Sequence, residues 1–485
     1  MTILRLLLPH GDARNWHLAL RDRLRNAGFR VEIDFAPGAA PPLALRLCEE
    51  LESLIYGARG AGLCQPVEAV ATTSGESAML LDLTGAAIPA RGAITPLYDG
   101  VAGEAARDAA LLDGRMPRLS LARVTDVGFQ ILAEGLPALE RPWMLRAGRE
   151  AIAARILALA PIAVRNFQAE RTEVSAPRLA APRNPLAFLA SSIVGRAQAR
   201  IARLTTHPDH WRIGWRPLGA DGGVMARQGW GANGWTWLAD DRQRYFADPF
   251  PFEHEGRLYL FCEEYPYATG KGVISVTALD GANQPQTPRI VLETGCHLSY
   301  PLVFRQDGEI WMMPESSGAR RLDLYRASRF PDRWVFDRTL IDGLEISDAT
   351  PFEADGRWWM TATVSEEGGS SWDCLSLFTA PNRLGPWTRC GDGPVLIDAS
   401  CARPAGHVQA IGGALWRPAQ DCVGGYGAGL ALCRIDHVGE DGFRQTRATR
   451  LGPPPGAPRD GVHTLNIGGG FEFIDAVGRE PKGRS

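Results

Sequence analysis

The chain has 485 residues, of which 45% are hydrophobic and 22% charged, and its formal net charge is −3. This composition excludes an intrinsically disordered chain, and the length predicts two or three globular domains. Because the charges nearly balance, no chain-wide positive field attracts nucleic acid or an anionic lipid surface. The 54 Gly, 35 Pro and 14 Trp indicate many turns and aromatic-rich strands.

The nine cysteines form no CxxC pair. An odd number without metal-ligand spacing is a poor zinc, haem or disulfide pattern, and it favours reduced thiols in a cytosolic protein. The N-terminal run MTILRLLLPHGD is too short for a signal peptide, and no stretch approaches the roughly 20 apolar residues that span a bilayer. We therefore expect a cytoplasmic protein without a transmembrane segment.

Residues 1–165 alternate between strand and helix patterns. Strands are expected at 3–8, 31–35 and 78–83, and helices at 15–27 and 43–56. This order predicts an α/β, Rossmann-like domain with a doubly wound parallel sheet. His10, Asp82 and Asp99 follow expected strands, where such sheets bind ligands, although capping of helices and turns is the commoner role for these residue types.

Residues 166–210 read as a linker with one helix. The linker contains the Pro-rich stretch SAPRLAAPRNP, and a helix is expected over 185–204 with Arg196, Arg200 and Arg203 on its solvated face. His207 and His210 are three residues apart. We interpret them as part of a loop before a strand rather than as metal ligands.

The second half of the chain contains an internal repeat. Three segments align without gaps on a Phe that is followed four residues later by Gly: ADPFPFEHEGRLYLFCEE (247–264), SYPLVFRQDGEIWMMPES (299–316) and SDATPFEADGRWWMTATV (347–364). Each reads as strand, tight turn and strand, and two looser copies follow. A period of about 50 residues with five copies predicts a five-bladed β-propeller over 211–485, with the segment 211–218 completing the last blade.

The repeat register brings polar residues to one place. Four residues before the aligned Phe stand Asp248, Tyr300 and Asp348, with Arg403 and His463 at similar places in the looser copies. Four residues after the aligned aromatic stand Glu263, Glu315, Thr363 and Gln420. Equivalent positions are related by rotation, so these side chains should surround one funnel. Buried unpaired carboxylates are costly and such a cluster suggests a site, but turn hydrogen bonds for each Asp and Arg partners for each Glu would also explain it.

Several motifs on these strands resemble a known family. ADPF, EGRLYLFCEE, CHLSYP, MMPES, DATPF, LGPW, ARPAG and RPAQD resemble the N-terminal propeller domain of plant glucosamine inositolphosphorylceramide transferase and its bacterial relatives. The resemblance covers about 235–475, and it extends distantly to propeller glycosidases of the arabinanase, xylosidase and invertase type. In those enzymes an Asp-Pro of the first blade supplies the base or nucleophile, and Asp248 matches it. Their second-blade Asp and third-blade Glu align with Tyr300 and Thr363, which puts ordinary glycoside hydrolysis in doubt.

The N-terminal half resembles the formyltransferase-like domains that precede this propeller in bacterial proteins. The Asn-His-Asp set of formyl transfer, with its HPSLLP-type stretch, is not found in 1–165. We therefore expect a degenerate formyltransferase-like domain without formyl-transfer chemistry.

Together these features predict a carbohydrate-active protein that acts on a glycosidic or activated-sugar bond in surface glycan or glycolipid biosynthesis. One carboxyl group would protonate the leaving oxygen while another acts as base or nucleophile. We assign Asp248 as base or nucleophile and Glu315 as acid, with Asp348 as the alternative acid. The expected substrate-binding residues are Glu263, His297, Tyr300, Arg403, Gln420, Asp421 and His463.

The alternative is a propeller that binds a glycan without turning it over. The missing family carboxylates favour this alternative, whereas the convergence of charged residues favours an enzyme, either a glycosyltransferase or a glycoside hydrolase. The expected partner is a sugar, a nucleotide-sugar or a glycolipid, and not nucleic acid. No metal ligand is assigned, and a divalent cation in the funnel is left open because carboxylates and water suit Ca²⁺.

Overall fold

The computed structural model describes residues 3–38, 41–57, 62–72, 79–168, 173–174, 184–232, 234–279, 285–458 and 460–482. The chain divides into two compact units. The N-terminal unit comprises Met1–Gln198 with Glu366–Ser370, and the propeller unit comprises Ala199–Ser365 with Ser371–Ser485. The predicted helix of the linker is α5 (Pro185–Thr205), which contains the boundary between the units; most of the Pro-rich stretch before it lies outside the described residues.

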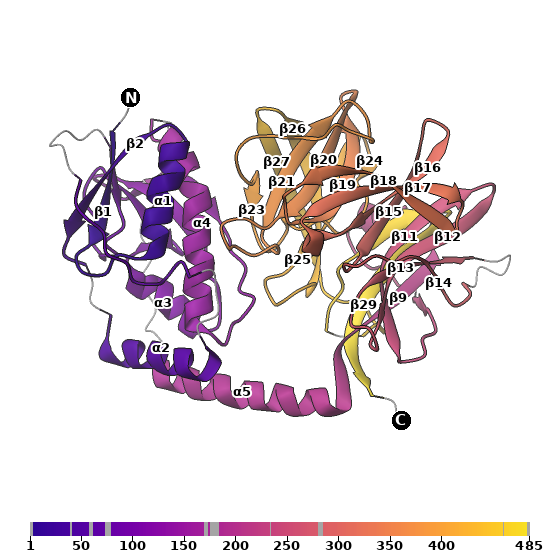
Figure 1. Ribbon diagram of the computed structural model, residues 1–485, viewed down its shortest axis with the longest axis horizontal. Coiled ribbons are helices and arrows are strands. Elements are labelled where there is room, and N and C mark those ends of the chain that lie inside the picture. Colours follow the sequence, from indigo (N-terminus) through magenta and orange to yellow (C-terminus); the bar gives the residue numbers. More distant parts are fainter. Residues whose placement is uncertain are drawn as a thin grey trace. The chain divides into compact units, whose positions relative to one another are not determined.

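The N-terminal unit is built on one mixed sheet with the strand order β2-β1-β3-β4-β6-β7-β8, and β5 pairs with β4. The strands are β1 (Ile3–Pro9), β2 (Arg30–Ala36), β3 (Met79–Asp82), β4 (Ile94–Tyr98), β5 (Val101–Ala102), β6 (Leu119–Val124), β7 (Phe129–Gly135) and β8 (Glu173–Val174). The helices are α1 (Asn15–Asn26), α2 (Leu43–Tyr56), α3 (Glu104–Leu112) and α4 (Leu145–Arg165). α1 packs against α4, which also covers β6 and β7 (Figure 1).

The first half of this sheet agrees with the sequence pattern. β1, α1, β2 and α2 occupy the predicted places, and β3 lies within the predicted strand 78–83, whose first residue is outside the described residues. β2, β1, β3 and β4 are parallel, but β4, β6, β7 and β8 are antiparallel neighbours, so the prediction of a wholly parallel sheet is wrong. The reason is local: only four residues, 125–128, join β6 to β7, and so short a connection can join only antiparallel strands.

The predicted five-bladed propeller is confirmed. The propeller unit contains five sheets, each with four strands hydrogen-bonded side by side. In the third sheet β23 (Leu396–Ile397) pairs additionally with β21. Blades one and two are β11 (Arg244–His254), β12 (Arg257–Pro266), β13 (Val273–Ala278), β14 (Arg289–Leu292), β15 (Ser299–Gln306), β16 (Glu309–Glu315), β17 (Arg321–Arg329) and β18 (Arg333–Asp342). Blades three and four are β19 (Ile346–Ala354), β20 (Arg357–Val364), β21 (Cys374–Ala380), β22 (Thr388–Arg389), β24 (Gln409–Ile411), β25 (Ala414–Asp421), β26 (Gly429–Gly439) and β27 (Gly442–Leu451).

Blade five closes the ring with strands from both ends of the propeller sequence. It consists of β9 (Thr206–Pro217), β10 (Thr236–Trp237), β28 (Leu465–Gly468) and β29 (Phe471–Pro481). β9 pairs antiparallel with β29 over nearly its whole length, which confirms that 211–218 completes the last blade (Figure 1). Ile213 of β9, Phe473 of β29 and Leu260 of β12 share one buried cluster, so closure joins blade five to blade one through apolar contacts.

The hairpins of the first three blades turn at the predicted dipeptides. Both central residues have positive φ at Glu255–Gly256, Asp307–Gly308 and Asp355–Gly356. This is the backbone of a type I′ turn, which matches the twist of the flanking strands and which Asp-Gly favours. The turns fix the register of each hairpin, and the register determines which residues face the axis. Within the described residues, no helix combines the length and apolar character that a membrane span requires.

Candidate functional site

A repeated bulge shapes the first strand of three blades. In β11, β15 and β19 the pairing with the next strand shifts between residues 247 and 250, 299 and 302, and 347 and 350. The residue inside each bulge has a left-handed φ: 50° at Asp248, 46° at Tyr300 and 52° at Asp348. Such a conformation costs a non-glycine residue on the order of 1 kcal/mol or more, and it persists where surrounding bonds hold it, often at functional sites.

Carboxylates hold these three bulges. The backbone N–H of Asp248 donates to Asp475 Oδ2 at 3.0 Å, that of Tyr300 to Asp248 Oδ2 at 3.0 Å, and that of Asp348 to Glu315 Oε2 at 3.1 Å. Each bond joins neighbouring blades. The carboxylates are therefore part of the fold as well as of the candidate site, and they bond bulges of neighbouring blades rather than the turns that the alternative explanation invoked.

Asp248 lies in a buried group with two further titratable residues. Its Oδ1 accepts a hydrogen bond from Thr464 Oγ1 at 2.8 Å, and His463 Nε2 lies 3.9 Å from the same oxygen. Burial raises the pKa of Asp248 to about 7, with the charges of Glu263 and Asp475 adding to the rise and that of His463 opposing it. A carboxyl group with a pKa near neutrality can both accept and release a proton, which suits acid–base chemistry.

His463 supplies a positive charge to this group. Its ring stacks on Trp211 with centroids 3.9 Å apart, and its Nδ1 lies 2.6 Å from Asp475 Oδ2. Burial lowers the pKa of His463, but the charge of Asp475 and the hydrogen bond to it outweigh burial, and the pKa is raised to about 9. The ring is therefore an imidazolium at neutral pH.

A second buried group surrounds Asp348. Arg403 Nε donates to Asp348 Oδ2 at 2.6 Å, and Gln420 Nε2 donates to the same oxygen at 3.1 Å. Arg403 also lies 3.9 Å from Glu315 Oε2. Burial raises the pKa of Asp348 well above its ordinary value; Arg403 opposes this, whereas the charge of Glu315 and a hydrogen bond between the two carboxyl groups add to it. The Glu315–Asp348 pair can thus share one proton.

Glu263 and His297 form a third group beside the first. His297 Nε2 lies 3.2 Å from Glu263 Oε1, and His297 Nδ1 accepts a hydrogen bond from the Gly272 N–H at 3.0 Å. Because Nδ1 is an acceptor, the proton of the neutral ring is on Nε2, facing Glu263. The His297 side chain is 42% exposed, so this pair meets solvent, unlike the two groups described above.

Three positions singled out from the sequence bring no free acidic group to the site. Tyr300 is buried, and its hydroxyl is taken by Thr350 Oγ1 at 2.8 Å and by the Gly406 N–H at 2.7 Å, so it is bound within the fold. Asp421 pairs with Arg450 of β27, away from the other candidates. Thr363 is buried and brings no carboxyl group to the strand position that Glu263 and Glu315 occupy in the first two blades.

The sequence reasoning missed Asp475, Trp211 and Tyr426. In blade one Phe250 pairs with Phe261, and in blade five Leu465 pairs with Ile474. When the two blades are aligned on these pairs, Ala476, not Asp475, occupies the position equivalent to Glu263. Asp475 therefore lies one residue off the repeat. Tyr426 follows β25 in a loop, where its ring lies 5.0 Å from the Arg403 guanidinium and exposes 38% of its surface. An exposed aromatic over a buried cation is suited to contact a sugar ring.

Asp248, His463 and Asp475 are also a donor set for a metal ion. One ligand atom from each lies within 4.8 Å of the others, and carboxylate and imidazole suit several divalent cations. In the structure these side chains already have partners, since His463 bonds Asp475 and Thr464 donates a hydrogen bond to Asp248. A cation would have to displace the proton of the imidazolium, so the residues fit a proton better than a metal.

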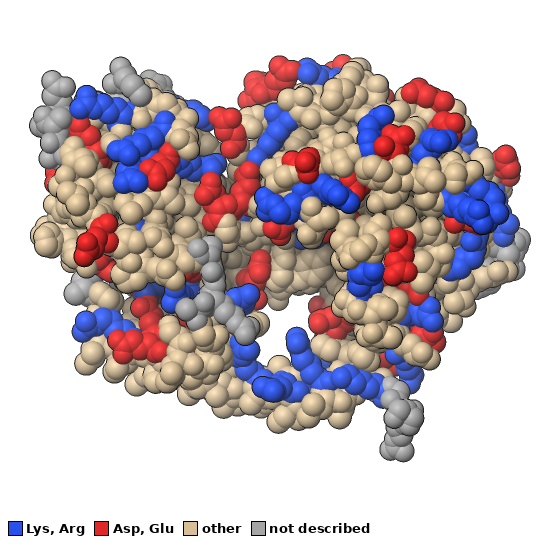
Figure 2. Space-filling view, in the orientation of Figure 1, with Lys and Arg blue, Asp and Glu red and all other residues tan. Residues whose placement is uncertain are grey.

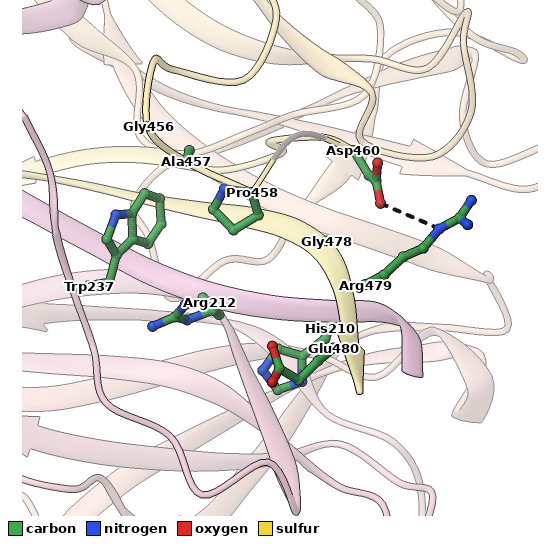
Figure 3. Close-up of a pocket in the computed structure, with 10 residues that line it drawn as sticks. All are labelled: His210, Arg212, Trp237, Gly456, Ala457, Pro458, Asp460, Gly478, Arg479 and Glu480. Carbon is green, nitrogen blue, oxygen red and sulfur yellow. Dashed lines mark ion pairs between the residues drawn. The ribbon is translucent and has the colours of Figure 1, made fainter. Parts of the chain in front are cut away.

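A separate cavity of about 490 Å³ lies on blade five (Figure 3). Its walls come from β9, β10, β29 and the loop before β28, and Asp460 and Arg479 form an ion pair of 4.0 Å at its edge. The lining residues are His210, Arg212, Trp237, Gly456, Ala457, Pro458, Asp460, Gly478, Arg479 and Glu480. None of the residues predicted from the sequence as catalytic or substrate-binding is among them.

Solved structures similar to this chain include propeller-type glycosidases. A β-xylosidase, RS223, is 13% identical, with 49% of this chain and 93% of that chain covered and a TM-score of 0.37. A family 117 glycoside hydrolase of the marine bacterium Zobellia galactanivorans is 12% identical, with 55% and 90% covered and a TM-score of 0.35.

Sequence comparison gives a closer relationship. The family described as "Glucosamine inositolphosphorylceramide transferase 1, N-terminal" matches residues 239–451. The protein named glucosamine inositolphosphorylceramide transferase 1 is 34% identical over 205 residues in Oryza sativa subsp. japonica and 29% identical in Arabidopsis thaliana. The alignments cover 41% of this chain and 27% of each relative, so the chain spans about a quarter of the curated relatives it matches. Blades one to four of this propeller therefore resemble the N-terminal domain of the glucosamine inositolphosphorylceramide transferases.

Proposed function

We propose that the propeller site acts on a glycosidic or activated-sugar bond in the biosynthesis of a surface glycan or glycolipid. The observation that carries the proposal is the pairing of two kinds of carboxyl group in one buried cluster: Asp248, with a pKa near 7, and the proton-sharing pair of Glu315 and Asp348. The names of the matched relatives support a sugar and a sphingolipid as the substrate class.

In this proposal the Glu315–Asp348 pair protonates the leaving oxygen. Arg403 and Gln420 both bind Asp348 Oδ2, and these bonds favour the charged form of Asp348. The alternative acid is Asp348, whose pKa burial raises, and the residue expected to act as acid is Glu315. Its Oε1 is also held by Ser317 Oγ at 2.9 Å, so the carboxyl group keeps one orientation.

Asp248 acts as base or nucleophile. Thr464 and the Tyr300 N–H each occupy one of its oxygens, which fixes the carboxylate plane, and the His463 imidazolium stabilises its charged form. Tyr426, His297 and Glu263 have the placement expected of groups that bind sugar hydroxyls and a sugar face, since the first two are partly exposed and Glu263 bonds His297.

The test is the substitution Asp248→Asn with a panel of nucleotide-sugars and glycolipid acceptors. Asn keeps the shape and an acceptor oxygen but removes the basicity, so turnover should fall by roughly 10²- to 10⁴-fold with thermal unfolding little changed. The control is Asp355→Asn, an exposed turn residue whose left-handed φ of 52° is close to the 50° of Asp248, and it should leave turnover unchanged. Equal turnover in Asp248→Asn and the parent protein would refute the assignment.

A binding module without turnover is the second candidate. Thr363 brings no carboxyl group, and the Tyr300 hydroxyl is taken up within the fold, so two positions that are acidic in propeller glycosidases do no chemistry here. In this case isothermal titration would show binding of one panel member without any product, and Asp248→Asn would weaken the affinity.

A further inference from the structure

Exposed apolar side chains gather on two helices of the protein. Among the described residues, 18 large hydrophobic side chains are exposed, and ten of them lie on α2 and α5. They are Leu43, Leu47, Leu51, Leu54, Ile55, Leu186, Ile193, Val194, Ile201 and Leu204. Single exposed apolar residues are ordinary, but a group confined to two helices marks an interaction surface.

On α5 these side chains form a stripe. Leu186, Ile193, Ile201 and Leu204, with Ala190 and Ala197 between them, follow one another at steps of three or four residues, the spacing of one helix face. No residue from 193 to 205 is buried, so this part of the helix contributes nothing to a core. Among the described residues the stripe is not buried, so the stability of the fold does not explain it.

Arginines flank this stripe. Arg196, Arg200 and Arg203 each precede a stripe residue by one position and therefore lie about 100° round the helix from it. The segment 185–205 contains three arginines and no acidic residue. Figure 2 shows the basic side chains along the lower edge, where α5 runs. The chain as a whole is slightly acidic, so this positive charge is a local feature.

α2 adds exposed apolar side chains to the same surface. Cys48 Sγ lies 3.6 Å from the carbonyl oxygen of Pro185, and the Arg196 guanidinium lies 4.6 Å from the centre of the Tyr56 ring, so the first part of α5 runs alongside α2. The buried face of α2 is formed by Leu45, Cys48 and Glu52, which leaves its leucines at 43, 47, 51 and 54 facing solvent.

We propose that this amphipathic surface, the ten apolar residues above with Arg196, Arg200 and Arg203, docks on a membrane surface that contains anionic lipid. Apolar side chains beside arginines, without acidic residues on the same helix, match the boundary between acyl chains and negative headgroups. A second copy that paired α5 with α5 would bury the apolar stripe but would leave the arginines without a complement, since α5 carries no carboxylate. On α2, Glu50 is exposed, so the positive charge of the surface lies on α5. The inference is independent of the proposed function, because the candidate site lies in the propeller and uses none of these residues.

The test is sedimentation of the full chain with vesicles of phosphatidylcholine alone and of phosphatidylcholine mixed with phosphatidylglycerol. We expect binding to the mixed vesicles only, and weaker binding at high salt. Arg200→Gln with Arg203→Gln should weaken it by about fivefold for each arginine. Ile201→Gln with Leu204→Gln should weaken it as well. The matched control is Val335→Gln with Phe336→Gln, two exposed apolar residues of β18, which should bind as the parent does.

Three results would overturn the proposal. The first is the absence of binding to either vesicle by a well-folded parent protein. The second is binding that the α5 variants leave unchanged although their circular dichroism matches the parent. The third is a concentration-dependent dimer, measured by light scattering, that the same α5 variants dissolve, since this would make a second copy the occupant of the surface.

Discussion

The buried charges of the candidate site depend on one another. Asp248, Asp475, Glu315 and Asp348 are all buried, and the cations that touch them are His463 and Arg403. Four carboxylates and two cations cannot all be charged in a region of low dielectric, so the cluster keeps protons at neutral pH. The raised pKa values of Asp248 and Asp348 express this excess of acidic groups. The cluster is therefore sensitive to pH at the residue scale.

His463 should make the stability of the propeller fall with rising pH. Its pKa is raised from 6.5 to about 9 in the folded protein. The stabilisation is fully present below pH 6.5 and is lost as the pH rises through 9, a change on the order of 3 kcal/mol. In urea unfolding, the free energy of unfolding should fall less between pH 6 and pH 9 for His463→Gln than for the parent protein. The control is His437→Gln at a more exposed position, where this fall should equal that of the parent protein. An equal fall in both variants would contradict the link between His463 and stability.

Strands and turns of the propeller were predictable to different degrees. The hairpin turns were predicted from Asp-Gly and Glu-Gly between alternating apolar residues, because few sequences tolerate two successive positive φ values. The bulges at Asp248, Tyr300 and Asp348 were not predicted, because one additional residue in a strand leaves the alternation nearly intact. Pro249 and Pro301 directly after two of the bulged residues were the available signal, since proline cannot donate to the ladder.

The same limit applies to the members of the site. Rotational equivalence in the repeat found Glu315, Asp348 and Arg403, which the structure brings into contact across blades. It also found Asp248, which accepts a hydrogen bond from the Tyr300 N–H of the next blade. It failed for Asp475, which lies one residue off the register of the other blades, and for Tyr426, which belongs to a loop outside the repeat. A repeat predicts only what every copy positions in the same way.

The closure between β9 and β29 should depend on one buried ion pair. Arg216 Nε donates to Glu472 Oε2 at 2.8 Å, and both side chains are nearly fully buried. Arg216→Met would leave the buried Glu472 with the longer contact of 3.7 Å to Arg227 Nη2, and it should cost on the order of 3 kcal/mol of unfolding free energy. Urea unfolding measures the loss. Arg357→Met removes an exposed pair with Glu440 on the same propeller and should cost less than about 1 kcal/mol; losses of equal size would show that closure does not depend on Arg216.

At the scale of the whole molecule, the two units differ in how far they can be interpreted. The propeller unit contains the candidate site and the match to a known family. The N-terminal unit has a mixed sheet, and its Rossmann-like, degenerate formyltransferase-like character remains a prediction. Asp82, one of the strand-end residues noted in the sequence, accepts hydrogen bonds from Thr84 and from the Ala90 N–H, as a turn-stabilising carboxylate does. The structure thus gives this residue a local role.

Because the contacts of the candidate site join residues of the propeller unit, the site should survive without the N-terminal unit. The stack of Trp211 on His463, the bonds from Asp248 to Asp475, and the bridge from Arg403 to Asp348 all lie between residues 199 and 485. A chain that begins at Ala199 retains β9 and can close the ring. It should bind the same sugar ligand as the full chain within about twofold, as measured by isothermal titration. It should also lose vesicle binding, since it lacks α2 and the first two-thirds of α5. A well-folded propeller whose sugar affinity falls tenfold would show instead that the N-terminal unit completes the site.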